Sequence, residues 1–319
     1  MEGIRKRIRT VLGVCRFWLG ATRATFAPAS MVPVVLGGAI AAHYRAFATG
    51  RFLLAAAGVL ALHLGANLVN DYYDYASGAD VIRDSRTPFY GGGTILVEGA
   101  LSPRQVSRAY RSLYAAALLT GIALAAARGA GVLALGLAGF LCGYFYTAPP
   151  LRLSYVGLGE ATIGLCFGPL TVAGTLLAET GAVTPEALVA SIPVGLLVAA
   201  VVFVNEFPDR AADGAAGKRT LVVRLPLRAA IACYAALVLA PFAVIAAAIL
   251  LDLLPRAAAL AYLALPLALN AVKHLQAAHA DPPVSNPSAF APSHQVAASI
   301  ATILLHLAVG LLLSLAYVL

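Results

Sequence analysis

The chain has 319 residues, of which 61% are hydrophobic and only 11% are charged, and its mean hydropathy is +0.86. This composition excludes a soluble domain of this length, in which about 25% of the residues are charged, and several apolar runs approach or exceed the roughly 20 residues that cross a bilayer core. The net charge of +8 is typical of basic cytoplasmic loops in a membrane protein, so we expect no nucleic-acid partner. The four cysteines, Cys15, Cys142, Cys166 and Cys233, are isolated in the sequence and indicate neither a disulfide framework nor a zinc site.

The first 26 residues are basic and amphipathic. Over residues 4–19 the apolar side chains repeat at helical spacing, and Arg5, Lys6, Arg9 and Arg16 lie largely off that stripe. This pattern predicts a helix on an anionic membrane surface. The competing interpretation, a cleaved signal peptide, is disfavoured because no small-residue cleavage site follows. We therefore divide the chain into an interfacial segment, 1–26, and a single transmembrane domain, 27–319.

Long apolar runs predict an all-α, polytopic membrane protein with nine transmembrane helices. The expected spans cover residues 27–43, 52–70, 105–127, 130–147, 157–178, 187–207, 228–251, 257–275 and 295–318. In this arrangement 18 of the 22 Lys and Arg residues fall on one side of the membrane, and Arg45, Arg51, Arg128 and Arg256 fall on the other. The positive-inside rule then places the N-terminus in the cytoplasm and the C-terminus outside.

Carboxylates and amides gather after the second apolar run, in the stretch NLVNDYYDYASGAD over residues 67–80. Asn67 and Asp71 are four residues apart, and Asp74 follows one helical turn later, so these side chains share one face if the helix continues this far. Asn70 and Asp80 add further oxygen donors to the stretch. His63 extends the same face by one turn, but such a histidine is more often a packed polar residue than a ligand.

A second polar cluster, Asn205, Asp209 and Asp213, repeats the spacing of four after the sixth apolar run. Both clusters fall on the cytoplasmic side of the predicted topology. Oxygen donors without thiolate or imidazole suit Mg²⁺, so we expect at least two Mg²⁺ sites that hold one polyanionic substrate from both sides. The alternative, in which the carboxylates are merely solvated beyond the helix ends, is less favoured for two matching clusters.

Basic and aromatic side chains accompany both clusters. The cations expected to contact a diphosphate are Arg83, Arg86, Lys218 and Arg219. Tyr146 ends the fourth span, and Arg152 follows the Pro149-Pro150 break. One cavity could therefore contain both the Tyr146 ring, which would stabilise a carbocation, and the positive charge of Arg152. An interfacial aromatic residue with a snorkelling arginine explains that spacing equally well. The glycines at 91–93 suggest a cytoplasmic cap loop, and 281–293 is a Pro-rich connection.

Taken together, these motifs resemble the UbiA superfamily of intramembrane prenyltransferases, most closely its MenA-like branch, which attaches a polyprenyl chain to 1,4-dihydroxy-2-naphthoate in menaquinone synthesis. The resembling stretches are the two clusters within NLVNDYYDYASGAD and NEFPDRAADGAAGKRTLVVRLP, together with PFYGGGTILVEGALSP, YTAPPLRLSYVGLGE, FGPLTVAGT and ATILLHLAVGLLL. They extend from the second span to the last.

The resemblance implies a helix bundle around a central cavity, a polyprenyl diphosphate and an aromatic acceptor as substrates, and an opening toward the lipid bilayer. It also implies that Asn67, Asp71, Asp74, Asn205, Asp209 and Asp213 bind Mg²⁺, that Lys218 contacts the diphosphate, and that Tyr146 and Arg152 lie near the reacting carbon. Gly78 departs from the family pattern, which often has an acidic residue there, and Asp80 is a candidate substitute.

Two alternatives remain open from the sequence. The same chemistry could use another acceptor, such as 4-hydroxybenzoate, homogentisate or a tetrapyrrole, because a few cavity residues decide acceptor choice. An ion-coupled transporter is disfavoured, because transporters usually place such charges near the bilayer midplane, whereas these lie at one face with Lys and Arg. No pattern in the sequence specifies an oligomeric state.

Overall fold

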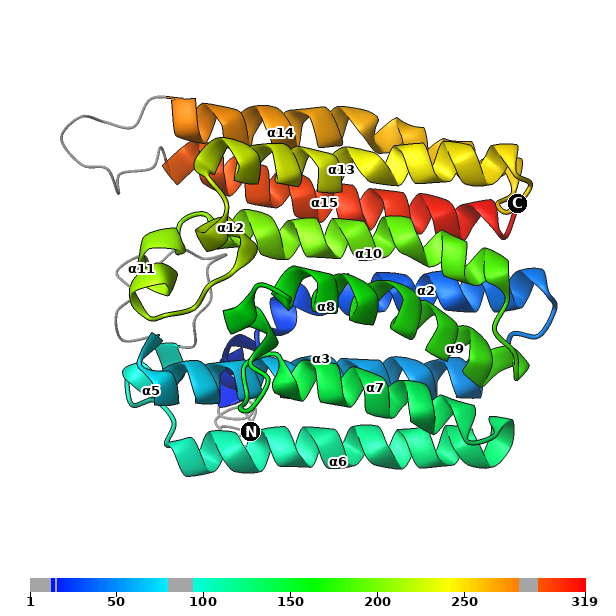
Figure 1. The fold of residues 1–319 in the computed structure, drawn as a ribbon. Coiled ribbons are helices and arrows are strands. Elements are labelled where there is room, and N and C mark those ends of the chain that lie inside the picture. Colours follow the sequence, from blue (N-terminus) through cyan, green and yellow to red (C-terminus); the bar gives the residue numbers. More distant parts are fainter. Residues whose placement is uncertain (1–12, 15, 80–93, 281–291) are drawn as a thin grey trace, which may run out of the picture.

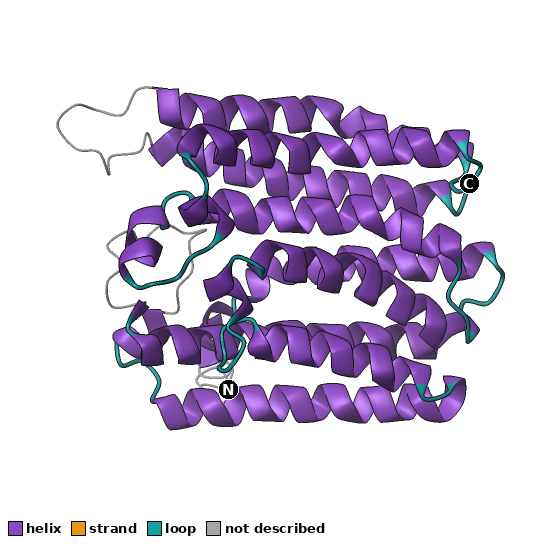
Figure 2. Ribbon diagram, viewed as in Figure 1, coloured by secondary structure: helices purple, strands orange, loops and turns teal. Residues whose placement is uncertain are grey.

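The computed structural model describes residues 13–14, 16–79, 94–280 and 292–319. Within these ranges the chain forms helices joined by turns and short connections, and contains no strand (Figure 2). The predicted all-α fold is therefore confirmed. Most of the predicted interfacial helix, the glycines at 91–93 and most of the Pro-rich connection lie outside the described residues.

The long helices run side by side along one direction (Figure 1). In chain order they are α2 (Ala27–His43), α3 (Thr49–Ser77), α6 (Pro103–Arg128), α7 (Gly131–Phe145), α8 (Gly159–Leu165), α9 (Thr171–Thr180), α10 (Pro185–Glu206), α13 (Leu227–Leu250), α14 (Leu265–Ala280) and α15 (Pro292–Ala316). A π-helical segment, Cys166–Leu170, joins α8 to α9, and a 3₁₀ helix, η4 (Arg256–Ala264), leads into α14. Short helices complete the described chain: η1 (Ala24–Phe26), α5 (Thr94–Val97), η2 (Leu153–Val156), α11 (Arg210–Ala215) and α12 (Leu221–Arg224).

Eight helical segments in the described chain are long and apolar enough to cross a bilayer, and they match eight of the nine predicted spans. The remaining predicted span corresponds to α7, which has only 15 residues. At a rise of 1.5 Å per residue α7 is about 22 Å long, less than the roughly 30 Å of a hydrocarbon core. The helix ends at Phe145 shortly before Pro149, since a proline disfavours helical backbone in the residue before it.

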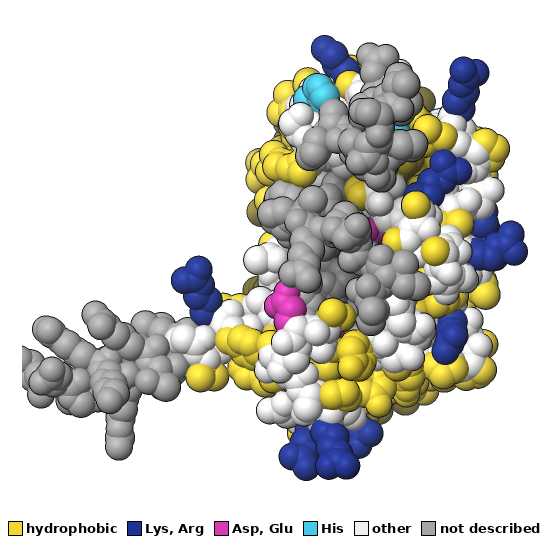
Figure 3. Space-filling view, turned by 90° about the vertical axis from the view of Figure 1, so that its left-hand side faces the viewer, with side chains coloured by type: hydrophobic (Ala, Val, Ile, Leu, Met, Phe, Trp, Pro, Cys, Tyr) yellow, Lys and Arg dark blue, Asp and Glu magenta, His cyan; other side chains and the backbone are white. Residues whose placement is uncertain are grey.

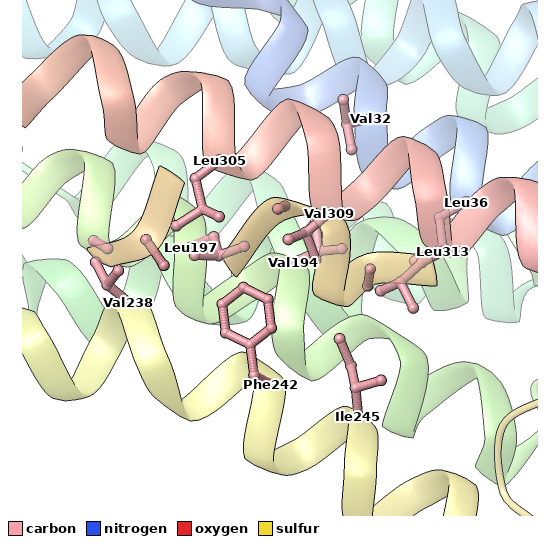
Figure 4. Packing of buried hydrophobic residues seen from close by; sticks show 14 of the residues in the cluster. Val32, Leu36, Val194, Leu197, Val238, Phe242, Ile245, Leu305, Val309 and Leu313 are labelled. Atoms are coloured by element: carbon pink, nitrogen blue, oxygen red, sulfur yellow. The ribbon is translucent and has the colours of Figure 1, made fainter. Parts of the chain in front are cut away.

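Helix α10 forms the centre of the apolar core. Val194 and Leu197 of α10 are fully buried and pack with Phe242 and Ile245 of α13 and with Leu305 of α15 (Figure 4). Large apolar side chains elsewhere point outward, as expected for surfaces that face lipid. Leu119 of α6, for example, is 67% exposed.

Glycines bring α10 and the α8–α9 segment into close contact. A Cβ atom on Gly195 of α10 would lie 2.5 Å from the carbonyl oxygen of Gly164, and one on Gly168 would lie 2.8 Å from the Cα of Gly195. The π-helical segment that contains Gly168 also contains Pro169, whose missing N–H it accommodates. Small residues thus set the helix spacing, as is usual within lipid.

Both polar clusters lie at one end of the bundle. Helix α3 reaches this end at Ser77, and α10 reaches it at Glu206, where α11 and α12 follow. Figure 1 shows α5, α11 and α12 at this end and the C-terminus at the opposite end. Seen end-on, this face carries Lys and Arg side chains around its periphery (Figure 3).

Candidate active site

A cavity of about 370 Å³ lies among α2, α3, α6, α7, the α8–α9 segment and α10. Helix α3 lines it with one face, at spacings of one, three or four residues: Ala55, Gly58, Val59, Leu62, His63, Ala66, Asn67, Asn70 and Asp74. Along this face the first positions are apolar except for His63, and the last three are polar. Helix α10 has the same gradient, from Val198 to Asn205. The cavity therefore has a polar mouth at the end that carries α11 and a largely apolar interior.

An ion pair joins the two clusters across the mouth. The Lys218 Nζ lies 3.2 Å from Asp74 Oδ2, although 144 residues separate the two in sequence, and Asn70 Nδ2 donates to the same oxygen at 3.3 Å. Asp74 is 1% exposed and Lys218 is 7% exposed. Two charges this buried require each other, since an unpaired buried charge is costly.

The first cluster lies on a continuous helix, because α3 extends through Asp71 and Asp74 to Ser77. Gly78 follows α3 with a φ of 80°, in the left-handed region. Gly78 therefore ends the helix in a backbone conformation that glycine adopts without the steric cost of a Cβ atom.

Arg23 compensates the negative charge of Asp71, the other carboxylate of this cluster. Its guanidinium forms an ion pair with Asp71 and donates to Asn70 Oδ1 at 3.2 Å. Arg23 lines the cavity, whereas Asp71 lies behind it, 1% exposed, and is not among the lining residues. Asn67, which also lines the cavity, donates to the carbonyl oxygen of Thr22 at 2.9 Å.

The second cluster continues across a short break in the helix. Helix α10 ends at Glu206, and Asp209 precedes α11, which carries Asp213. The Asp213 backbone N–H donates to the Asp209 carbonyl at 2.7 Å, and the Lys218 N–H donates to the Asp213 carbonyl at 2.8 Å. These bonds wrap the chain so that Asp209, Asp213 and Lys218 all line the mouth. Asn205 also lines the cavity, and its Oδ1 accepts from Ser299 Oγ at 2.9 Å.

Tyr155 supports the mouth from η2. Its hydroxyl donates to Asp74 Oδ1 at 2.8 Å and lies 2.8 Å from Ser77 Oγ. Burial, together with the negative charge of Asp74, raises the pKa of the Tyr155 phenol, so the phenol remains a hydrogen-bond donor at neutral pH. The ring also lies 5.7 Å from the Lys218 ammonium, close enough for a cation–π contact.

Tyr146 and Glu206 also line the cavity. Tyr146 follows α7, and its hydroxyl lies against Gly159, where an added Cβ atom would come within 3.2 Å. The Glu206 carboxyl of α10 interacts with that of Glu160 of α8. Glu160 is 3% exposed, and its Oε1 accepts from the Leu221 backbone N–H at 3.0 Å.

Besides Asp71, two predicted site residues of the described chain are not part of the cavity wall. Arg152 is exposed and lies over the outer side of Tyr155, with its guanidinium 5.4 Å from the ring centroid. Arg219 is also exposed, and its backbone rather than its side chain is anchored, through an N–H bond to the Tyr155 carbonyl at 3.1 Å. Asp80, Arg83 and Arg86 lie outside the described residues.

Arg23, Tyr155 and Glu206 were not singled out by the sequence. In the sequence Arg23 is one of several basic residues near the N-terminus. Nothing in its neighbourhood indicates that its partner is Asp71, which lies on α3. Glu206 did carry a usable signal, since a carboxylate at the end of an apolar span marks a functional position by default. His63, set aside as a packed residue, lines the cavity.

The mouth has the donor chemistry that suits Mg²⁺. Its carboxylates and amides offer oxygen ligands alone, and no three His, Cys, Asp or Glu side chains of the described chain converge closely enough to hold a metal by themselves. A cation here would take its other ligands from amides, water or a bound substrate, as Mg²⁺ usually does. Among the carboxylates that line the cavity, Asp74, Asp209 and Asp213 belong to the two clusters, and each would offer one ligand to such a cation.

Comparisons with known proteins agree with this geometry. Residues 30–294 match the model of the UbiA prenyltransferase family. The 1,4-dihydroxy-2-naphthoate octaprenyltransferase of Bacillus subtilis is 29% identical over 215 residues, which cover 67% of this chain and 68% of the relative. The 2-carboxy-1,4-naphthoquinone phytyltransferase of Synechocystis sp. is 28% identical over 280 residues, which cover 84% and 85% of the two chains.

The fold agrees as well. A UbiA homologue from Archaeoglobus fulgidus, solved bound to DMAPP and Mg²⁺, superposes with a TM-score of 0.62 at 16% identity, covering 93% of this chain and 98% of that one. The family match spans most of the chain, from the first long helix to the start of the last. The chain therefore belongs to the UbiA prenyltransferase family and is a polytopic membrane prenyltransferase.

Proposed function

We propose that this enzyme transfers a polyprenyl group from a polyprenyl diphosphate to an aromatic quinone precursor, with 1,4-dihydroxy-2-naphthoate as the favoured acceptor, in menaquinone synthesis. The observation that carries the proposal is the Asp74–Lys218 ion pair, which links the two acidic clusters at the mouth of a cavity with an apolar interior. The relatives from Bacillus subtilis and Synechocystis, named for naphthoate and naphthoquinone substrates, support the choice of acceptor.

The gradient along the cavity separates the two parts of a polyprenyl diphosphate. The anionic head lies at the mouth, where Lys218 and Arg23 supply positive charge, and the hydrocarbon chain lies along the apolar face of α3. Asp74, Asp209 and Asp213 would each offer a ligand to Mg²⁺, and Mg²⁺ would supply the remaining positive charge for the diphosphate. Positive charge at the mouth favours departure of an anionic leaving group.

Bond breaking and bond making then occur below the mouth. The allylic C–O bond breaks, and its electron pair leaves with the diphosphate, which Lys218 stabilises. The Tyr146 ring and the apolar walls keep water from the cationic carbon. The ring carbon that bears the carboxylate forms the new C–C bond, and the carboxylate leaves as CO₂, so that the electron pair of the broken C–C bond returns to the ring.

The test is an assay of the purified protein in lipid nanodiscs with a radiolabelled polyprenyl diphosphate and Mg²⁺, offered 1,4-dihydroxy-2-naphthoate or 4-hydroxybenzoate. We expect a prenylated, decarboxylated product from the naphthoate alone. Product from 4-hydroxybenzoate instead would move the function to that acceptor. Absence of any diphosphate turnover with all acceptors would contradict the proposal.

Removal of the metal is the companion measurement. Because carboxylates of both clusters, Asp74, Asp209 and Asp213, line the mouth, a diphosphate there requires added positive charge. We expect chelation with EDTA to abolish product formation and excess Mg²⁺ to restore it, whereas Ca²⁺, which prefers longer bonds and more ligands, should restore much less. Full activity after exhaustive chelation would contradict the metal assignment.

A further inference from the structure

The imidazole of His63 is a polar ring in the interior of the cavity that the mechanism above does not use. His63 of α3 lines the cavity and is 8% exposed. Neither of its ring nitrogens has a hydrogen-bond partner within the described part of the chain. Its ring meets Phe167, in the π-helical segment, edge-to-face at a centroid distance of 5.5 Å. The imidazole is thus held in place by packing while its nitrogens stay available.

The position of His63 excludes the diphosphate as its partner. His63 precedes Asn67 by one turn and Asp74 by eleven residues, so it lies about 16 Å below Asp74 along the axis of α3. The cations and carboxylates that suit a diphosphate are all at the mouth. A polyprenyl chain has no hydrogen-bonding atom, so it gives nothing to either ring nitrogen.

An aromatic acceptor does carry the matching groups. A neutral imidazole is a donor at one nitrogen and an acceptor at the other, and a phenolic hydroxyl is likewise both. A site built to hydrogen-bond a hydroxyl rejects analogues without it, because the buried polar group is then left unpaired. Since position excludes the diphosphate and the polyprenyl chain has no hydrogen-bonding atom, the acceptor is the substrate that can pair with this imidazole.

We propose that His63 is a positioning residue that hydrogen-bonds a ring hydroxyl of the aromatic acceptor and so sets acceptor specificity. The inference rests on the proposed function, because it takes a dihydroxynaphthoate as the ligand. Phe167 fixes the plane of the imidazole from the α8–α9 side, so the bound acceptor ring is oriented by a side chain with little freedom to move.

The test compares His63→Phe, which keeps a planar ring without nitrogens, with His63→Gln, which restores one amide. His306→Phe is the matched control, since His306 is buried on α15, 1% exposed, and is not among the cavity-lining residues. Binding of 1,4-dihydroxy-2-naphthoate is followed by its own fluorescence, without prenyl diphosphate, and steady-state assays give KM for both substrates.

We expect His63→Phe to weaken naphthoate binding by about tenfold, with partial recovery in His63→Gln, while KM for the prenyl diphosphate stays within about twofold. His306→Phe should leave both constants unchanged. The analogues 1-hydroxy-2-naphthoate and 4-hydroxy-2-naphthoate each lack one hydroxyl. The analogue that lacks the hydroxyl contacted by His63 should bind the wild type more weakly than 1,4-dihydroxy-2-naphthoate does. It should bind His63→Phe as well as 1,4-dihydroxy-2-naphthoate does, because the contact that the missing hydroxyl would make is already absent in that variant.

Unchanged naphthoate binding in His63→Phe, or a rise in KM for the prenyl diphosphate alone, would overturn the inference while leaving the proposed function intact. A wild type that neither binds nor prenylates the naphthoate would instead overturn the proposed function, and this inference with it. If His63→Phe elutes from gel filtration as an aggregate, His63→Leu gives the same comparison with a smaller apolar side chain.

Discussion

At the scale of single residues, the mouth of the cavity keeps buried charges because each one has a specific partner. Asp74 accepts from Lys218, Asn70 and Tyr155, and Asp71 pairs with Arg23. Partners of this kind lower the cost of burial but leave little tolerance for change, since removing one partner strands the other. We therefore expect the buried carboxylates of the two clusters to lower stability, as a site kept for function does.

Replacing any one of Asp71, Asp74, Asp209 or Asp213 by Ala should lower turnover at least about 100-fold, because each supplies or orients charge at the leaving group. Turnover of each variant is measured in nanodiscs, with gel filtration as the check on folding. Glu186→Ala, at the opposite end of α10, is the control and should stay near wild-type activity. Activity close to wild type in all four variants would refute the metal and diphosphate assignment.

Gly78 is a second position where one residue matters, for a backbone reason. Its φ of 80° is easy for glycine and costs an L-residue about 1 kcal/mol, so Gly78→Ala should lower the thermal midpoint in detergent by a few degrees. Gly50→Ala is the matched control at the other end of α3, where an added Cβ atom meets nothing within 4 Å. Equal midpoints for the two variants would argue against the helix end described above.

At the scale of elements, helix contacts depend on where side chains are missing. Gly195 of α10 faces Gly164 and Gly168 of the α8–α9 segment so closely that backbone meets backbone. These two elements carry Glu206, Glu160 and Phe167, so their separation also sets the width of the cavity. Packing density, rather than charge, fixes this part of the site.

Gly195→Ala should therefore destabilise the protein by roughly 1–3 kcal/mol, because the methyl group would meet the Gly164 carbonyl at 2.5 Å and a backbone atom cannot move aside cheaply. Thermal unfolding in detergent measures the effect, with Gly50→Ala again as the reference. A midpoint as high as that of the wild type would mean that α10 and α8 can separate without cost.

At the scale of the whole molecule, the two acidic clusters share one end of the bundle, as the predicted topology required. Arg45, Arg51, Arg128 and Arg256 fall beside the opposite helix ends. The predicted topology assigns the other 18 Lys and Arg residues to the side of the mouth. The positive-inside rule therefore predicts a cytoplasmic mouth and an external C-terminus.

Labelling with a membrane-impermeant thiol reagent tests this orientation. In a background with the native cysteines replaced by Ser, Arg256→Cys should react in intact cells, and Arg104→Cys should react only after permeabilisation. Both positions are exposed, at opposite ends of the bundle, and each variant loses one positive charge, so the pair is matched. The reverse labelling pattern would invert the topology.

The sequence by itself determined the membrane class, the helix pattern and the two acidic clusters, because hydropathy and spacing along one chain are local properties. The helix ends differ from the predicted spans: the second span is predicted to end at residue 70, but α3 continues to Ser77, since polar residues can extend a helix beyond the membrane core. The motif residues Asn67, Asp74, Asn205, Asp209, Asp213, Lys218 and Tyr146 all reach the cavity.

Only the tertiary structure decided which partners meet. The pairs Arg23–Asp71 and Lys218–Asp74 join residues 48 and 144 positions apart, and no local pattern encodes such distances. Spacing alone also could not separate Tyr146, which lines the cavity, from Arg152, which turns outward onto Tyr155. Sequence motifs identify most of the buried polar groups of the site. Their pairing depends on how the helices pack, because packing alone brings distant side chains within hydrogen-bonding distance.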